Sequence, residues 1–196
     1  MNILITGFDP FNNAAINPSY EAIKLLPDYI NGHKINKLLI PTSFKRSFDV
    51  LKESLDNNHY DYVILVGQAG GRNSITPEKV AINYIDASIK DNDNLIYHDQ
   101  PINKNNKEAY FSTLPIIKIR DLLNENDIKS TISYSAGTFV CNYLMYRTLE
   151  YFENTNTKAG FVHVPFENSQ VSDNKYFSMP LEEIKRALEI IISALD

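Results

Sequence analysis

Cys141, the only cysteine of the chain, is the side chain best suited to act as a nucleophile. It lies in the segment Ser135 to Asn142, which the sequence predicts to lead from a strand into a helix; Gly137 within it can adopt backbone conformations that other residues resist. Unpaired N–H groups and the helix dipole at a first turn would stabilise a thiolate, and the same N–H groups could hold an oxyanion. A lone cysteine is more often a buried apolar residue, so catalysis also requires a base.

His163 is the histidine best placed to be that base. The other three, His33, His59 and His98, lie in polar, loop-like surroundings, whereas His163 lies inside the strand-like run Phe161 to Pro165. An imidazole near the end of a strand can lie beside a thiol and take its proton. A histidine hydrogen-bonded within the core is the alternative interpretation.

A glycine-rich segment, Gly67 to Arg72, follows a predicted strand and precedes Glu78. Its glycines would let the backbone approach a ligand closely, but the spacing fits neither the dinucleotide fingerprint nor the phosphate-loop motif, which gives nucleotide binding little support. Glu78, between a turn and a strand-like run, could orient an imidazole. Considered alone, such a glutamate is more often a solvated surface charge.

Strand-like and helix-like segments alternate along the chain and would position these residues. Strands are predicted at 3–6, 35–40, 62–66, 128–134 and 161–164. A first helix is predicted to begin at Pro18 with Asn17 as its cap, and a second is predicted by the helical spacing of Phe44, Phe48, Leu51 and Leu55. Further helices are predicted at 114–123, at 139–152 and after Pro180.

This alternation predicts an α/β fold, with residues 1–196 forming a single domain. We expect a three-layer α/β/α sandwich around a twisted, mostly parallel (mixed) central sheet, with ligands bound beyond the carboxyl ends of its strands. The stretch 88–106, rich in Asp, Asn and Lys, is expected to form a mobile surface loop that covers a site or joins a partner subunit.

Composition restricts the function classes. The net charge of -5 does not fit the basic surface that a general nucleic-acid-binding protein needs. No apolar run approaches the roughly 20 residues that span a bilayer. One cysteine excludes an intrachain disulfide and a cysteine-only metal site, which fits a reducing compartment. We therefore expect a cytoplasmic protein that acts on small molecules or peptides, with no nucleic-acid or membrane partner.

Taken together, the segments resemble pyroglutamyl peptidase type I, also called pyrrolidone carboxyl peptidase, a family of cysteine peptidases. The resemblance is carried, in chain order, by residues 5–11, 17–19, 67–72, 75–83, 110–115, 135–142 and 163–165. It implies a triad of Glu78, Cys141 and His163, and hydrolysis of the amide bond after an N-terminal pyroglutamyl residue through a thioester acyl-enzyme. It also implies that no metal or organic cofactor is needed, and it suggests a homotetramer.

The implied substrate group, pyroglutamate, is a flat, neutral lactam without a free amine. A suitable pocket is therefore apolar with a few amide partners. The resemblance implies aromatic side chains against the ring, which are here Phe8, Phe11 and Phe139. It implies two further wall residues, Val140 and Met145, and two amide hydrogen-bonding partners, Asn17 and Gln68. Ordinary core packing is the alternative for the phenylalanines and Met145.

One departure from the family pattern falls near the implied site. Where members of the family usually carry an arginine, this chain has Ser88, and the following residues, 93–100, also depart from the usual pattern. Loss of a guanidinium could leave a protein that binds pyroglutamyl peptides but turns over slowly. A nucleoside phosphorylase-like enzyme is a third hypothesis, because that family has a related architecture and this chain has a glycine-rich loop.

Overall fold

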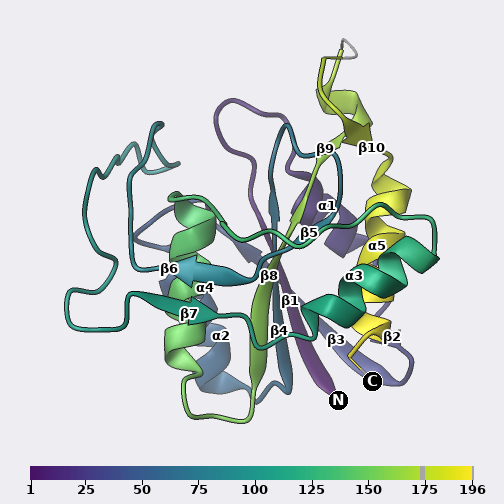
Figure 1. Cartoon of the computed structure of the whole chain (residues 1–196), viewed down its shortest axis with the longest axis horizontal. Helices are drawn as coiled ribbons and strands as arrows, with labels where there is room; N and C mark the ends of the chain where they lie inside the picture. Colours follow the sequence, from purple (N-terminus) through teal and green to yellow (C-terminus); the bar gives the residue numbers. More distant parts are fainter. Residues whose placement is uncertain (173–174, 196) are drawn as a thin grey trace.

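A central sheet carries most of the buried apolar runs. In the computed structural model, which describes residues 1–172 and 175–195, the sheet has six strands in the order β2-β3-β1-β4-β8-β5 (Figure 1). The strands are β1 (Asn2–Phe8), β2 (Tyr29–Ile30), β3 (His33–Ile40), β4 (Tyr62–Gln68), β5 (Thr76–Pro77) and β8 (Lys158–Val164). β1, β3, β4 and β8 are parallel, whereas the short edge strands β2 and β5 are antiparallel to their neighbours. The sheet is therefore mixed and mostly parallel, as predicted.

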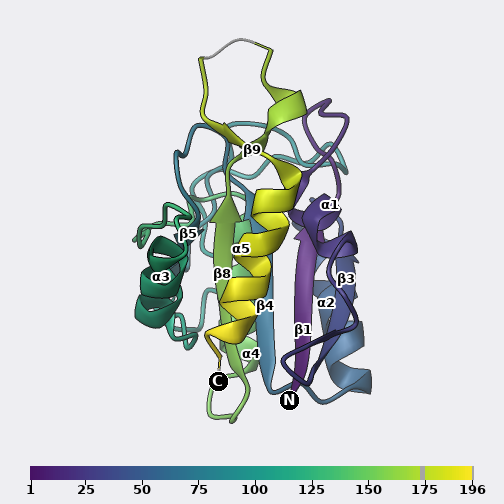
Figure 2. The same ribbon diagram turned by 90° about the vertical axis from the view of Figure 1, so that its right-hand side faces the viewer.

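Helices cover both faces of this sheet. They are α1 (Pro18–Lys24), α2 (Ser47–Asn57), α3 (Ile116–Glu125), α4 (Val140–Tyr151) and α5 (Leu181–Ser193). Apolar side chains of α1, α3 and α5 form one buried cluster with the sheet, and those of α2 and α4 form a second cluster on its other face (Figures 1 and 2). The arrangement confirms the predicted three-layer fold. Among the described helices, none has the length and apolar character needed to cross a membrane.

Two small sheets complete the fold. β6 (Val80–Ile82) pairs antiparallel with β7 (Ala109–Phe111), and β9 (Phe166–Glu167) pairs parallel with β10 (Ser178–Met179). A single 3₁₀ turn, η1 (Asn168–Gln170), follows β9 directly. β9 and β10 lie beyond the end of the sheet where its parallel strands finish, whereas β6 and β7 lie beside α4 (Figure 1).

The strand predicted at 128–134 is wrong. This stretch is extended and runs beside residues 75–79, but it makes only isolated bridges, at Ser130 and Ser133. Backbone hydrogen bonds join it to Ile75, to the carbonyl of Pro77 and to Lys79. Because proline has no N–H, Pro77 cannot donate to this ladder, which is therefore interrupted before a regular strand forms.

The irregular stretch at 88–106 has no helix or strand, as predicted, yet side chains attach it to the rest of the fold. The buried carboxylate of Asp91 accepts hydrogen bonds from the backbone N–H groups of Phe44 and Asp93. The Asp93 carboxylate in turn pairs with the guanidinium of Arg46 at 2.6 Å. These contacts connect the loop to the segment that enters α2, while its mobility stays a prediction.

The start of α4 is held by the side chain of Asn142. Its Oδ1 accepts from the Ile82 N–H at 3.0 Å, and its Nδ2 donates to the carbonyls of Ile82 and Tyr84 at 2.9 and 3.1 Å. The amide thus satisfies backbone groups of β6 as a neighbouring strand would. Asn142 is fully buried, so solvent cannot replace these bonds.

We expect Asn142→Ala to lower the free energy of unfolding by about 2 kcal/mol, because the Ile82 N–H and the Tyr84 carbonyl lose the side chain that pairs with them. The Ile82 carbonyl keeps its bond from the Tyr84 N–H. Urea denaturation monitored by circular dichroism measures the change. Asn58→Ala is the matched control, since Asn58 is exposed and bonds only to the Ser54 carbonyl of its own helix. Equal stability of the two variants would contradict this role.

Candidate active site

A cavity of about 160 Å³ opens beyond the carboxyl ends of the parallel strands. It is lined by Phe8, Phe11, Asn17, Thr42, Gln68, Ala136, Phe139, Cys141 and His163. β1, β4 and β8 contribute side chains from their last residues, and the first turn of α4 contributes the thiol. The nucleophile and the base suggested by the sequence therefore share one cavity at the expected edge of the sheet.

Cys141 is the second residue of α4 and is partly exposed in the cavity. Gly137, with φ of 79°, provides the left-handed turn that brings the chain into this helix. The side chain of the N-cap residue Phe139 makes no capping hydrogen bond. The N–H groups of the first turn have no partners within the helix, so they are suited to receive a developing negative charge.

Gly67 gives the sulfur its place against the sheet. A methyl group on Gly67 would lie 3.1 Å from the Sγ of Cys141 and 2.7 Å from the Phe161 ring, so a side chain at this position would displace one or both. Gly67 is also the direct neighbour of His163 in the pairing of β4 with β8. The glycine therefore lets the thiol approach the strand position beside the imidazole.

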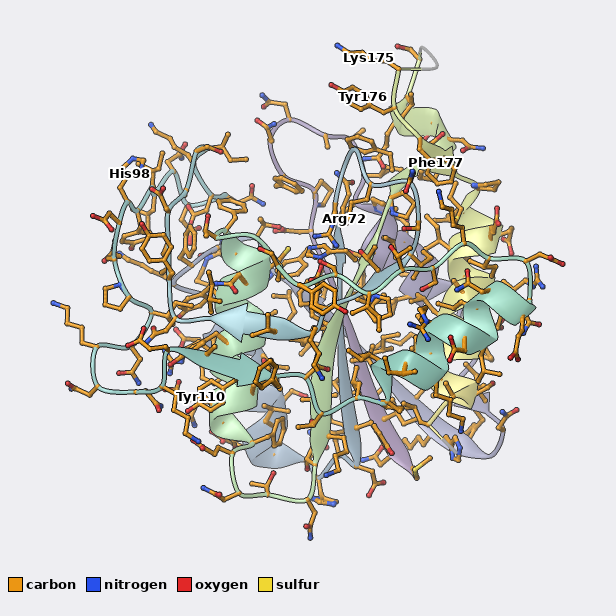
Figure 3. All side chains as sticks on the ribbon, viewed as in Figure 1. Arg72, His98, Tyr110, Lys175, Tyr176 and Phe177 are labelled. Carbon is orange, nitrogen blue, oxygen red and sulfur yellow. The ribbon has the colours of Figure 1, made fainter. Side chains whose placement is uncertain are left out.

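A short buried hydrogen bond joins His163 to Glu78. The Nδ1 atom of His163 lies 2.6 Å from Oε1 of Glu78, and the two side chains are 4% and 0% exposed. A carboxylate only accepts, so Nδ1 carries the proton and the lone pair of Nε2 is left to act as a base. Arg72 donates to the same Oε1 atom at 2.6 Å and to the carbonyl of Ser135 at 3.0 Å. Figure 3 shows Arg72 near the middle of the molecule, above the central strands.

Burial and charge set the protonation states of these groups. Burial raises the pKa of Glu78, but the hydrogen bond and positive charge of His163, together with Ser133 and Arg72, outweigh it, so the pKa lies below its ordinary value. Burial lowers the pKa of His163 despite the opposing effect of Glu78. Burial, then the negative charge of Glu78, raises the pKa of the Cys141 thiol to about 12. The resting site therefore holds a carboxylate, a neutral imidazole and a neutral thiol.

This set of groups is suited to acyl transfer by a thiol. The imidazole can take the thiol proton during attack on a carbonyl, which avoids the cost of a free thiolate in the cavity. In the described part of the chain, no three His, Cys, Asp or Glu side chains are grouped to hold a metal ion.

Most of the side chains suggested for substrate binding line the cavity. Phe8, Phe11, Phe139, Asn17 and Gln68 all do so. The rings of Phe11 and Phe139 are 6.3 Å apart, with 39° between their planes.

Val140 and Met145 do not contact the cavity. Both are fully buried in the apolar cluster between α4 and the sheet. Their positions on α4 turn these side chains toward the core, so the structure gives them a packing role.

Sequence reasoning missed three residues at or near the site. Thr42 and Ala136 line the cavity, and Arg72 contacts Glu78. Arg72 closes the glycine-rich segment, but no sequence pattern shows that its side chain reaches Glu78. Ser88, by contrast, is exposed on the loop and is not among the cavity residues.

Comparison with known proteins agrees with this geometry. The family described as pyroglutamyl peptidase matches residues 1–196, that is, the whole chain. The chain belongs to the pyroglutamyl peptidase family. A pyrrolidone-carboxylate peptidase of Streptococcus pyogenes serotype M4 is 46% identical over 198 residues, covering 100% of this chain and 92% of that protein.

Solved structures of pyroglutamyl peptidases have the same fold. The pyroglutamyl peptidase I of Bacillus amyloliquefaciens superposes with a TM-score of 0.96 at 38% identity, covering 99% of this chain and 94% of that one. The pyrrolidone carboxyl peptidase of Fervidobacterium islandicum AW-1 gives a TM-score of 0.95 at 34% identity, with 100% and 98% covered. Membership identifies the chain as a cysteine peptidase of the pyroglutamyl type and does not favour the binding-protein or phosphorylase alternatives.

The raised pKa of Cys141 predicts how the thiol reacts with iodoacetamide. Because the pKa is about 12, the thiolate fraction, and with it the alkylation rate, should rise about tenfold per pH unit from pH 6 to pH 10. Mass spectrometry follows the reaction directly, since the chain has one cysteine.

The urea-unfolded chain is the control for this measurement. Its thiol has an ordinary pKa near 8.5, so its rate should level off above about pH 9.5. A rate in the folded protein that is already constant near pH 6 would show a thiolate–imidazolium pair instead and would contradict the neutral resting state.

Proposed function

We propose that this pyroglutamyl peptidase uses Cys141 as nucleophile, His163 as general base and Glu78 to orient His163. It hydrolyses the amide bond that follows an N-terminal pyroglutamyl residue of a peptide. The observation that carries the assignment is the 2.6 Å bond between the buried Glu78 carboxylate and His163, in the cavity that also contains Cys141. That bond fixes the tautomer in which Nε2 can accept a proton.

In the first half-reaction the Cys141 proton passes to Nε2 of His163 while Sγ attacks the carbonyl carbon of pyroglutamate. N–H groups at the start of α4 stabilise the oxyanion. When the tetrahedral intermediate collapses, the C–N bond breaks, and the imidazolium gives its proton to the leaving amine. A thioester remains on Cys141.

In the second half-reaction water attacks the thioester and His163 takes a proton from that water. Collapse of this intermediate breaks the C–S bond, and the proton on His163 returns to sulfur. Free pyroglutamate leaves, and the neutral thiol and imidazole are restored. Glu78 stays ionised throughout and stabilises the imidazolium formed in each half-reaction.

Recognition of the lactam is assigned to the aromatic and amide side chains of the cavity. Phe8, Phe11 and Phe139 supply the apolar surface for the ring, and Gln68 supplies a hydrogen bond. Asn17 shapes the site from within the protein, because its amide oxygen accepts from Ser19 and its nitrogen donates to the Asp9 carbonyl. We assign it one remaining amide hydrogen for the substrate at most.

The decisive assay is release of a chromogenic amine from a pyroglutamyl amide. We expect turnover by the wild type, none with a prolyl amide, and a loss of at least about 10³-fold in Cys141→Ser because the thiol nucleophile is removed. Iodoacetamide treatment should abolish activity equally.

A folded wild type that releases no amine would overturn the proposed function. Ser88→Arg is then the next variant to assay, because the resemblance to the family implies an arginine at this position. Recovery of turnover in that variant would assign the lost activity to this one position.

We also propose that the chain forms a homotetramer in the cytoplasm. Large apolar side chains exposed on the surface support self-association, namely Tyr29, Phe111, Ile117, Tyr134, Tyr176 and Phe177. Figure 3 shows Tyr176 and Phe177 in the segment that protrudes beyond β9 and β10. The single cysteine supports a reducing compartment.

Light scattering should therefore give a mass of about four times 22.4 kDa. Burial of exposed aromatic side chains between subunits provides the driving force. A mass of 22.4 kDa at micromolar concentration would contradict the tetramer.

A further inference from the structure

Gln170 lies behind the cavity and reaches one of its lining residues. It is the last residue of η1, and its Nε2 atom donates to the Oε1 atom of Gln68 over 2.9 Å. Gln68 is the last residue of β4 and lines the cavity, whereas Gln170 is not among the lining residues of the described chain. The contact therefore joins the small β9–η1 extension to the site.

Backbone groups fix which way the Gln170 amide faces. Its Oε1 accepts from the N–H of Glu167 at 2.9 Å, and its Nε2 donates to the carbonyl of Ile16 at 3.3 Å. A backbone N–H can only donate and a carbonyl can only accept, so exchanging the two ends of the amide would break both bonds. Gln170 consequently presents N–H to Gln68.

The orientation of the Gln170 amide determines that of the Gln68 amide. Because Gln170 presents a donor, Gln68 must turn its oxygen toward Gln170, and its own NH₂ group lies at the opposite end of the amide. Within residues 1–172 and 175–195, that nitrogen has no hydrogen-bond partner. Because Gln68 lines the cavity, the end of its amide that is free to bind a ligand is a hydrogen-bond donor.

Asn17 and Thr42, the other amide and hydroxyl side chains of the cavity, are already hydrogen-bonded within the protein. The Oδ1 atom of Asn17 accepts from Ser19 and its Nδ2 donates to the Asp9 carbonyl, at 3.0 Å. The hydroxyl of Thr42 also donates to the Asp9 carbonyl, at 3.2 Å. Asn17 is left with one amide hydrogen at most, so the orientation of Gln68 decides whether the second amide of the cavity presents a donor or an acceptor.

We propose that Gln170 is a positioning residue that sets the specificity of the site for a lactam. It holds the NH₂ group of Gln68 toward the cavity, where this group donates to the ring carbonyl of pyroglutamate. A proline ring has no carbonyl and would leave the donor unpaired, which costs binding free energy. The inference rests on the proposed function and adds a residue outside the cavity to it.

Gln170→Glu tests the orientation directly. A carboxylate keeps the bond from the Glu167 N–H but presents an acceptor to Gln68, so Gln68 turns and places its oxygen against the lactam carbonyl. The KM for a pyroglutamyl amide should rise about tenfold or more, with kcat within about threefold, because the ring contact is made equally in ground and transition states.

Gln170→Ala separates orientation from simple structural support. It removes all the hydrogen bonds of the side chain but leaves Gln68 free to turn either way, so KM should rise only about threefold. If Gln170 had a purely structural role, the KM of Gln170→Ala would be at least as high as that of Gln170→Glu. Asn168→Asp, which adds the same charge at an exposed position of the same turn, should keep the wild-type KM.

A double-mutant cycle checks that Gln170 acts through Gln68. Gln68→Ala removes the amide, so adding Gln170→Glu to it should raise KM no further. Additive effects, an unchanged KM in Gln170→Glu, or equal KM values in the glutamate and alanine variants would each overturn the inference. Circular dichroism and urea denaturation establish that every variant is folded.

Calorimetric titration of 2-pyrrolidone into Cys141→Ser, with and without Gln170→Glu, repeats the test without turnover. We expect about tenfold weaker binding of this lactam in the double variant, and equal binding would overturn the inference. If the wild type showed no turnover, the proposed function would be contradicted. The role of Gln170 would then be decided by the calorimetric comparison.

Discussion

The hydrogen bond between Glu78 and His163 is the constraint on which the rest of the site depends. An ionised carboxylate without solvent contact is unfavourable unless charged or hydrogen-bonded partners surround it, and here His163 and Arg72 share one of its oxygens. Arg72 also donates to the carbonyl of Ser135, so the same ion pair secures the loop that leads into α4. The position of His163, the proposed base, and the approach to Cys141, the proposed nucleophile, thus follow from a single buried charge.

Backbone geometry then brings the thiol to this base. The parallel strands β4 and β8 place Gly67 and His163 side by side, and the absence of a side chain on Gly67 leaves room for the sulfur. Asn142 attaches the first turn of α4 to β6 through both ends of its amide. The helix start is therefore fixed by a segment outside the central sheet, without a capping side chain that would occupy its free N–H groups.

Sequence reasoning predicted the features that depend on local pattern or on the family resemblance. Apolar periodicity predicted the three layers, and Asn17 does cap α1 ahead of Pro18. It failed where distant contacts decide, since Pro77 interrupts the ladder that would have made residues 128–134 a strand. The burial of Val140 in the core likewise depends on how α4 packs on the sheet. The contact between Arg72 and Glu78 arises from the folding of a glycine-rich turn, for which the sequence offers no spacing rule.

A thiol that stays protonated at rest also affects chemical durability. Peroxides attack the thiolate far faster than the thiol, so the burial that raises the pKa of Cys141 slows the first step toward sulfenic acid. The chain has no second cysteine that could trap such an oxidised sulfur as an intrachain disulfide. Protection of Cys141, the proposed nucleophile, therefore rests on its burial in the cavity, and repair after oxidation depends on thiols supplied from outside.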